Sequence, residues 1–84
     1  MPADAALKQQ IHDILRERFP GETVDVSDGD GDNIHVVVVS RQFDGLRERE
    51  KQDLLWTAID RSGLSDHEKT LISLILPYSP GDLK

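Results

Sequence analysis

The 84-residue sequence contains no cysteine. This absence excludes a disulfide framework and any metal site built from the chain's own thiolates. A hydrophobic core in a chain of this length is marginal, but it is sufficient to hold one small domain without cross-links. The lack of cysteine fits a reducing compartment, and we therefore expect a cytoplasmic protein.

Long hydrophobic runs are also missing from the sequence. The longest, Val36–Val39 and Leu74–Leu76, are far too short to span a bilayer. The opening residues, Met1 to Asp4, include no basic side chain, and no apolar segment follows them. We therefore expect neither a signal peptide nor a membrane partner.

Positive charge is scarce, because 16 acidic residues face 10 lysines and arginines and the net charge is −6. Diffuse binding to nucleic acid requires clustered positive charge, so an acidic chain of this kind disfavours it. The densest basic group is interrupted by two glutamates, which is typical of a solvated, mixed-charge helix face. If the chain bound nucleic acid, this group would supply the contacts: Arg41, Arg47, Arg49 and Lys51.

Recognisable catalytic motifs are absent as well. The sequence has no glycine-rich phosphate loop opening a helix, no nucleophile elbow and no pair of histidines spaced for one helix face. The chain is therefore predicted not to be an enzyme. The acidic loop of residues 28–33 begins like a calcium loop, but it lacks the glycine at position six and the glutamate at position twelve. We interpret it as a hairpin connection and leave weak cation binding open.

The first half of the chain predicts a helix and two strands. Apolar residues recur at helical spacing from Ala5 to Phe19, Asp4 is placed to cap this helix, and Pro20-Gly21 ends it. Residues 22–27 alternate apolar and polar side chains, as in a half-buried strand. A second strand over residues 34–40 contains four consecutive valines, which indicates burial on both faces or a core strand.

The second half predicts a long helix, a short helix and a third strand. Residues 46–61 have helix-forming composition and an apolar stripe, with Asp44 as the expected N-cap. Ser65 and Glu68 form a capping-box pattern that opens a short helical turn, and residues 71–76 form a strand. Trp56 flanks the apolar stripe and, if exposed, would anchor an interface.

These elements predict one small α+β domain over residues 1–84, with the order α-β-β-α-(short α)-β. A three-stranded mixed sheet with helices packed on one face buries all the apolar stripes. Residues 1–5 and 81–84 are expected to be frayed.

The middle of the sequence follows a pattern known from one protein family. A strand ending in a small residue precedes Phe-x-Gly, a charged helical turn, a basic residue and an apolar pair before an aromatic. The matching positions are Val36–Ser40, Phe43-Asp44-Gly45, Lys51, Leu54-Leu55, Trp56 and Ile59. The chain resembles the BolA-like proteins over roughly residues 20–80, although most members carry tyrosine at the place of Trp56.

The resemblance implies a KH-like variant of the α+β fold and a partner, a monothiol glutaredoxin. In that family the glutaredoxin and glutathione supply thiolates to a shared [2Fe–2S] cluster, and the BolA-like protein supplies imidazole in a redox or stress role. Cluster irons do accept histidine in place of cysteine. By position, His67 is the first candidate ligand and His35 the second, although both stand slightly off the family positions.

Two further interpretations stay open. Some BolA-like proteins and the KH-like fold suggest nucleic-acid binding or transcriptional regulation, although the Gly-x-x-Gly loop of KH domains is absent. A divergent member that has kept the fold and lost the cluster would be a protein-interaction module. The chain itself is expected to be a monomer or a weak homodimer.

Overall fold

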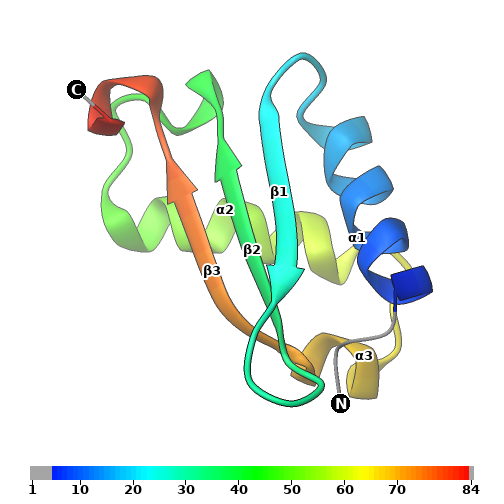
Figure 1. Cartoon of the computed structure of the whole chain (residues 1–84). Coiled ribbons are helices and arrows are strands. Elements are labelled where there is room, and N and C mark those ends of the chain that lie inside the picture. The colour runs from blue at the N-terminus through cyan, green and yellow to red at the C-terminus, as the bar shows by residue number, and fades with distance from the viewer. Residues whose placement is uncertain (1–4, 84) are drawn as a thin grey trace.

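The computed structural model describes residues 5–83, so the expected Asp4 cap lies outside the described residues. Three strands and three α-helices follow in the predicted order, with a single-turn 3-10 helix after β2 and another after β3 (Figure 1). The elements are α1 (Ala5–Arg18), β1 (Thr23–Asp28), β2 (Ile34–Val39), η1 (Arg41–Phe43), α2 (Glu48–Asp60), α3 (Asp66–Thr70), β3 (Ile72–Tyr78) and η2 (Pro80–Leu83). The predicted α+β class is confirmed. None of the helices in the described part of the chain is long and apolar enough to cross a membrane.

The sheet is mixed, as predicted. Its order is β1-β2-β3, with β1 and β2 antiparallel and β2 and β3 parallel. The loop of residues 29–33 joins β1 and β2 as a hairpin, and α2 and α3 provide the crossover that a parallel pair requires.

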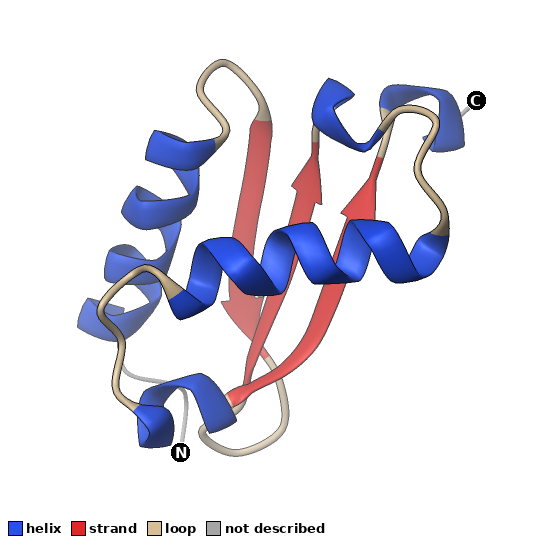
Figure 2. Ribbon diagram, turned by 180° about the vertical axis from the view of Figure 1, so that it is seen from behind, coloured by secondary structure: helices blue, strands red, loops and turns tan. Residues whose placement is uncertain are grey.

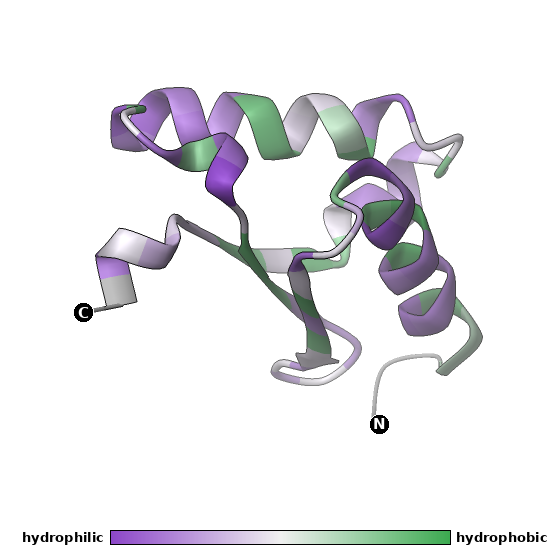
Figure 3. Ribbon diagram, turned by 90° about the horizontal axis from the view of Figure 1, so that it is seen from above, coloured by the Kyte–Doolittle hydropathy of each residue, from purple (hydrophilic) through white to green (hydrophobic). Residues whose placement is uncertain are grey.

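The two long helices, α1 and α2, lie against the same side of the sheet, and the short α3 lies at its lower end. Seen from behind, α2 crosses that face of the strands, and α1 packs alongside β1 (Figure 2). The view from above shows the helices on one side of the sheet and none of the described chain covering the other (Figure 3). The core between these layers is built from aliphatic side chains and two phenylalanines: Leu7, Ile11, Leu15, Phe19, Val24, Ile34, Val36, Val38, Phe43, Leu55, Ala58, Ile59, Leu64, Ile72 and Ile75.

The valine run forms the central strand, but only one of its faces is fully buried. Ile34, Val36 and Val38 are buried, while the side chains between them are half-buried. The reason is the single helical layer, because alternate side chains of a strand point to opposite faces. The core-strand alternative is therefore correct, and burial on both faces is not.

The prediction of Asp44 as a helix N-cap is wrong. Asp44 instead closes the 3-10 helix η1, where its amide donates to the carbonyl of Arg41. Ser40 starts η1, since its hydroxyl accepts from the amide of Gln42 at 3.0 Å. Gly45 then turns the chain with φ of +76°, a conformation that favours glycine.

The helix expected from Leu46 begins at Glu48, because the turn at Gly45 is followed by an N-cap at Arg47 and not at Asp44. Arg47 stands at its N-cap with extended backbone, and the Arg47 amide donates to Glu50 Oε1 at 2.8 Å. A glutamate three residues into the helix thus satisfies the free amide of Arg47, whose own side chain has no hydrogen-bond acceptor. At α3 the predicted capping box is confirmed, with Ser65 and Glu68 exchanging both hydrogen bonds at 2.9 and 3.1 Å.

The last strand and the C-terminal residues are more ordered than predicted. β3 continues past residue 76 through Pro77, which an edge strand tolerates because proline lacks a donor. Residues 80–83, expected largely as a frayed tail, form η2. The Asp82 carboxylate fixes this turn by accepting from the amide of Ser79 at 2.9 Å and from Lys51 Nζ at 2.7 Å.

Candidate functional site

The side of the sheet without helices, here called the open face, carries the candidate site. On β2 it presents His35, Val37 and Val39, which pair in register with Leu74, Leu76 and Tyr78 of β3. On β1 the corresponding partners are polar, with Ser27 opposite His35 and Asp25 opposite Val37. Two apolar columns and one polar column therefore lie side by side, with His35 at one end.

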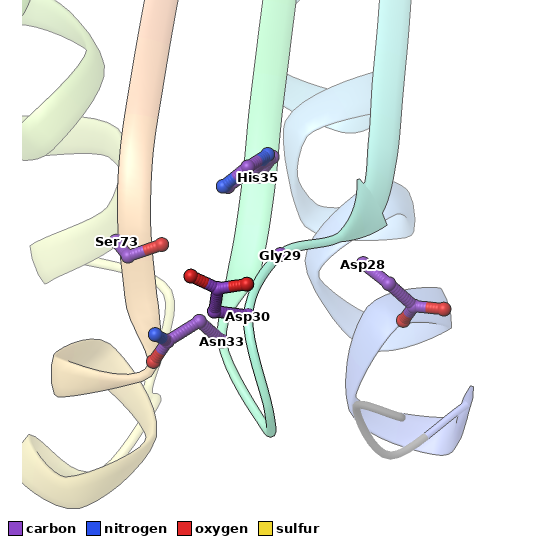
Figure 4. A pocket seen from close by; sticks show the side chains of 6 residues that line it. All are labelled: Asp28, Gly29, Asp30, Asn33, His35 and Ser73. Carbon is purple, nitrogen blue, oxygen red and sulfur yellow. The ribbon is translucent and has the colours of Figure 1, made fainter. Parts of the chain in front are cut away.

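A shallow pocket of about 510 Å³ opens at the His35 end of this face. Its lining comes from the hairpin loop, β2 and β3, and comprises Asp28, Gly29, Asp30, Asn33, His35 and Ser73. Figure 4 shows the side chains of Asp30 and Ser73 below the His35 ring, whereas the Asp28 carboxylate points away from it. Asp28 instead accepts from Lys8 Nζ at 2.7 Å.

The imidazole of His35 lies beside Gly29 of the hairpin loop. A Cβ placed on Gly29 would lie 2.7 Å from His35 Nε2 and 2.8 Å from Cδ2, closer than real Cβ contacts. The ring can therefore occupy this position beside the loop only because residue 29 has no side chain. Gly29 thus helps to position the imidazole.

Ser73 reaches the pocket because the pairing of β2 and β3 shifts at this point. Ile34 pairs with Ile72, but His35 pairs with Leu74, so Ser73 is an extra residue on β3. Such a bulge turns two consecutive side chains outward, and both Ser73 and Leu74 are exposed.

His67, the first ligand candidate from the sequence, lies elsewhere. It is exposed on α3, and its backbone carbonyl accepts from Thr70 Oγ1 at 2.6 Å. It is not among the residues that line the His35 pocket. The two candidate histidines are therefore not brought together in that pocket, and the structure gives His35 the more organised surroundings.

The acidic loop is closed by its own backbone. The amide of Gly29 donates to the carbonyl of Asn33 at 2.8 Å, and the amide of Asn33 donates to the carbonyl of Asp30 at 2.9 Å. Within residues 5–83, no three histidine, aspartate or glutamate side chains gather in a way that would hold a metal ion. The loop is the hairpin connection that the sequence predicts.

The four basic residues of the nucleic-acid interpretation do not share one environment. Arg41, Arg47 and Arg49 are exposed, but Lys51 is only 8% exposed. Its ammonium group binds the Asp82 carboxylate, and this hydrogen bond raises the pKa of Lys51 and lowers that of Asp82. The ammonium group of Lys51 thus forms the ion pair that links α2 to η2.

Trp56 packs against the core as a half-buried side chain. The exposed apolar surface lies instead on β2 and β3, and sequence reasoning did not identify it. The valine run was a usable signal, because four consecutive apolar residues on a strand covered on one face leave two of them on the other face. Gly29 and Ser73 carried no signal, because their contacts depend on the hairpin and on the shift in pairing.

No protein-family model matches the sequence, and no curated protein matches it significantly. Its structure, however, is similar to the crystal structure of a Bol-like protein from Babesia bovis. The two share 24% identity with a TM-score of 0.65, and the match covers 89% of this chain and 86% of the other. The chain therefore has the BolA-like fold that the pattern around Phe43-Asp44-Gly45 predicts.

Proposed function

We propose that this chain is a non-enzymatic, BolA-like accessory protein that binds a monothiol glutaredoxin and contributes imidazole to a shared [2Fe–2S] cluster. The observation that carries the proposal is the position of His35. Its ring lies at the open end of a BolA-like sheet, beside a pocket and against a glycine that holds its orientation.

The side chains of this protein are compatible with a cluster whose thiolate ligands come from the partner and whose imidazole ligand comes from this chain. The chain has no cysteine, so every thiolate would come from the partner. A neutral imidazole is an accepted ligand of cluster iron and raises the potential relative to thiolate. A ligating imidazole needs a polar group for its second nitrogen, and the pocket offers Asp30, Asn33 and Ser73.

His35 is the first ligand in this proposal and His67 the second. His35 is half-buried and lies against Gly29, so less conformational freedom is lost when it binds. His67 is exposed on a five-residue helix. Its side chain would have to be ordered by the partner.

The test is an anaerobic titration of the chain into cluster-loaded monothiol glutaredoxin, followed by visible circular dichroism. We expect a new cluster spectrum with the native chain, loss of that spectrum with His35→Ala, and a smaller change with His67→Ala. His12→Ala, which removes a histidine from α1, is the matched control and should behave as the native chain. An unchanged spectrum with the native chain, together with no complex on a sizing column, would rule out the proposed function.

Nucleic-acid binding gains no support from the placement of its candidate residues. Lys51 is held by Asp82, so three exposed arginines of that group remain, on a chain of net charge −6. Transcriptional regulation by direct contact is therefore not part of the proposal.

A further inference from the structure

The open face presents a row of apolar side chains that no helix of residues 5–83 covers. We call Val37, Val39, Leu74, Leu76 and Tyr78 the open-face patch. Leu74 is the most exposed large hydrophobic residue among those described, at 41%. The register of β2 and β3 makes these five side chains neighbours, and His35 continues the same column on β2. Contiguous apolar surface of this kind marks interaction sites more often than scattered apolar residues do.

The charged residues of the strands and the hairpin loop are all acidic, and one of them, Asp28, is already paired with Lys8 of α1 at 2.7 Å. Residues 23–39 and 72–78, which form the three strands and the hairpin loop, contain no lysine or arginine. They do contain four aspartates: Asp25, Asp28, Asp30 and Asp32. Asp25 is directly opposite Val37 on the open face, and Asp30 lines the His35 pocket. A complementary partner surface is therefore apolar and flanked by basic residues.

Electrostatics disfavour a second copy of the chain as the occupant. Each copy carries a net charge of −6, and a self-association through this face would bring its aspartates toward those of the partner copy. A nucleic acid is disfavoured for the same reason, because its phosphates would meet an acidic rim. The remaining candidate for the open face is a different protein whose binding surface is apolar and flanked by basic residues.

The proposed cluster partner fits this description. A thiolate is stabilised at neutral pH by nearby lysine, arginine or a helix N-terminus, so the surface around a cluster-binding thiolate is electropositive. The open face gives a partner direct access to His35, because α1 and α2 occupy the other side of the sheet (Figures 2 and 3). We propose that the open-face patch, with Asp25 at its side, is the docking surface for this thiol-bearing partner. The inference rests on the proposed function and adds where the partner binds.

The test measures binding of the native chain and its variants to the monothiol glutaredoxin without cluster, by isothermal titration. Leu74→Lys places a cation in the patch, and we expect about a tenfold or greater loss of affinity, as at a buried interface position. Asp25→Lys should weaken binding by about tenfold and more strongly at low salt. Asp53→Lys makes the same change in net charge on the exposed side of α2 and should leave the affinity within about twofold.

Spectra of the 15N-labelled chain locate the contact independently of these variants. Amide shifts on adding the cluster-free partner should concentrate in β2 and β3. If the native chain binds but the shifts map to α1 and α2, or if Leu74→Lys and Asp25→Lys bind as the native chain does, the docking surface is wrong while the proposed function stands. If neither form of the glutaredoxin binds the native chain, both proposals fail. A concentration-dependent dimer of the native chain that Leu74→Lys dissociates would assign the face to a second copy and overturn the inference.

Discussion

The two faces of β2 differ in burial although their residues are nearly the same. Ile34, Val36 and Val38 are fully buried under the helices, while His35, Val37 and Val39 remain half-buried on the open face. Apolar character alone therefore does not decide which side of this strand becomes core. The position of the helical layer decides it, and what remains apolar on the other side is available for binding.

The largest contrast between the faces is expected for Phe43→Ala. Phe43 is completely buried and its ring centroid lies 5.5 Å from that of Phe19. Truncation leaves a cavity and should cost about 3–5 kcal/mol of unfolding free energy, a large share of what a domain of this size possesses. Urea denaturation measures this loss. Leu74→Ala on the open face is the comparison and should stay within about 0.5 kcal/mol, and equal losses for the two variants would contradict the assignment of the faces.

Two valine-to-alanine substitutions on β2 compare the burial of its two faces with the same change of side chain. Val36→Ala should cost about 2 kcal/mol, because two buried methyl groups are removed and partly replaced by a cavity. Val37→Ala should cost less than about 1 kcal/mol, since the side chain is only half-buried. Both variants lose the same strand propensity, so the difference in urea midpoint reports burial alone. A larger loss for Val37→Ala would mean that the open face is covered in solution.

Much of this fold follows from local sequence signals. Helical spacing of apolar residues from Leu7 to Phe19, the valine run and the Ser65 capping box each predict the observed element. The start of α2 was missed because Asp44 is an equally good end for a 3-10 helix. Which role an aspartate takes depends on the tertiary position of Phe43, which is buried against Phe19.

The candidate site is less predictable from sequence than the fold. His35 was identified as a residue type, but its contact with Gly29 and its nearness to Ser73 arise from the hairpin and from the shifted pairing with β3. His67 ranked first because of its place along the chain, yet it is exposed on α3 and does not line the His35 pocket. Long-range register, which no local pattern encodes, makes this difference.

Substitutions at two glycines of the hairpin loop distinguish an effect on the position of His35 from an effect on the stability of the fold. Gly31 has φ of +58° with no atom near its missing Cβ, so Gly31→Ala should cost about 1 kcal/mol through the backbone and leave His35 unchanged. Gly29→Ala should cost less than about 1.5 kcal/mol, because the imidazole can turn away, but it should displace the ring. Imidazole 1H–15N correlation spectra follow the ring and urea midpoints follow stability. Unshifted His35 signals in Gly29→Ala would remove Gly29 as a positioning residue.

The smallest effect on stability is expected at the ion pair between Lys51 of α2 and Asp82 of η2. Among residues whose burial is described, Lys51 is the one buried charged side chain, and its Nζ lies 2.7 Å from Asp82 Oδ2. The hydrogen bond from Lys51, aided by the amide of Ser79, lowers the pKa of Asp82. A carboxyl with a lowered folded pKa stabilises the fold above its ordinary pKa, and this stabilisation is lost as the pH falls through the folded value.

Lys51→Met should therefore lower stability at neutral pH, and its difference from the native chain should shrink as the pH falls from the ordinary carboxyl pKa toward the lower pKa of folded Asp82. The raised pKa of Lys51 gives the opposite limit, because its contribution is present at neutral pH and is lost only as the pH rises through the raised pKa of the folded state. Lys8→Met removes the equally short but more exposed pair with Asp28 and should have a smaller effect at neutral pH. Thermal unfolding from pH 2 to pH 11 measures both variants. A Lys51→Met difference that stays constant from pH 7 to pH 2 would assign the loss to packing of the lysine stem and not to its charge.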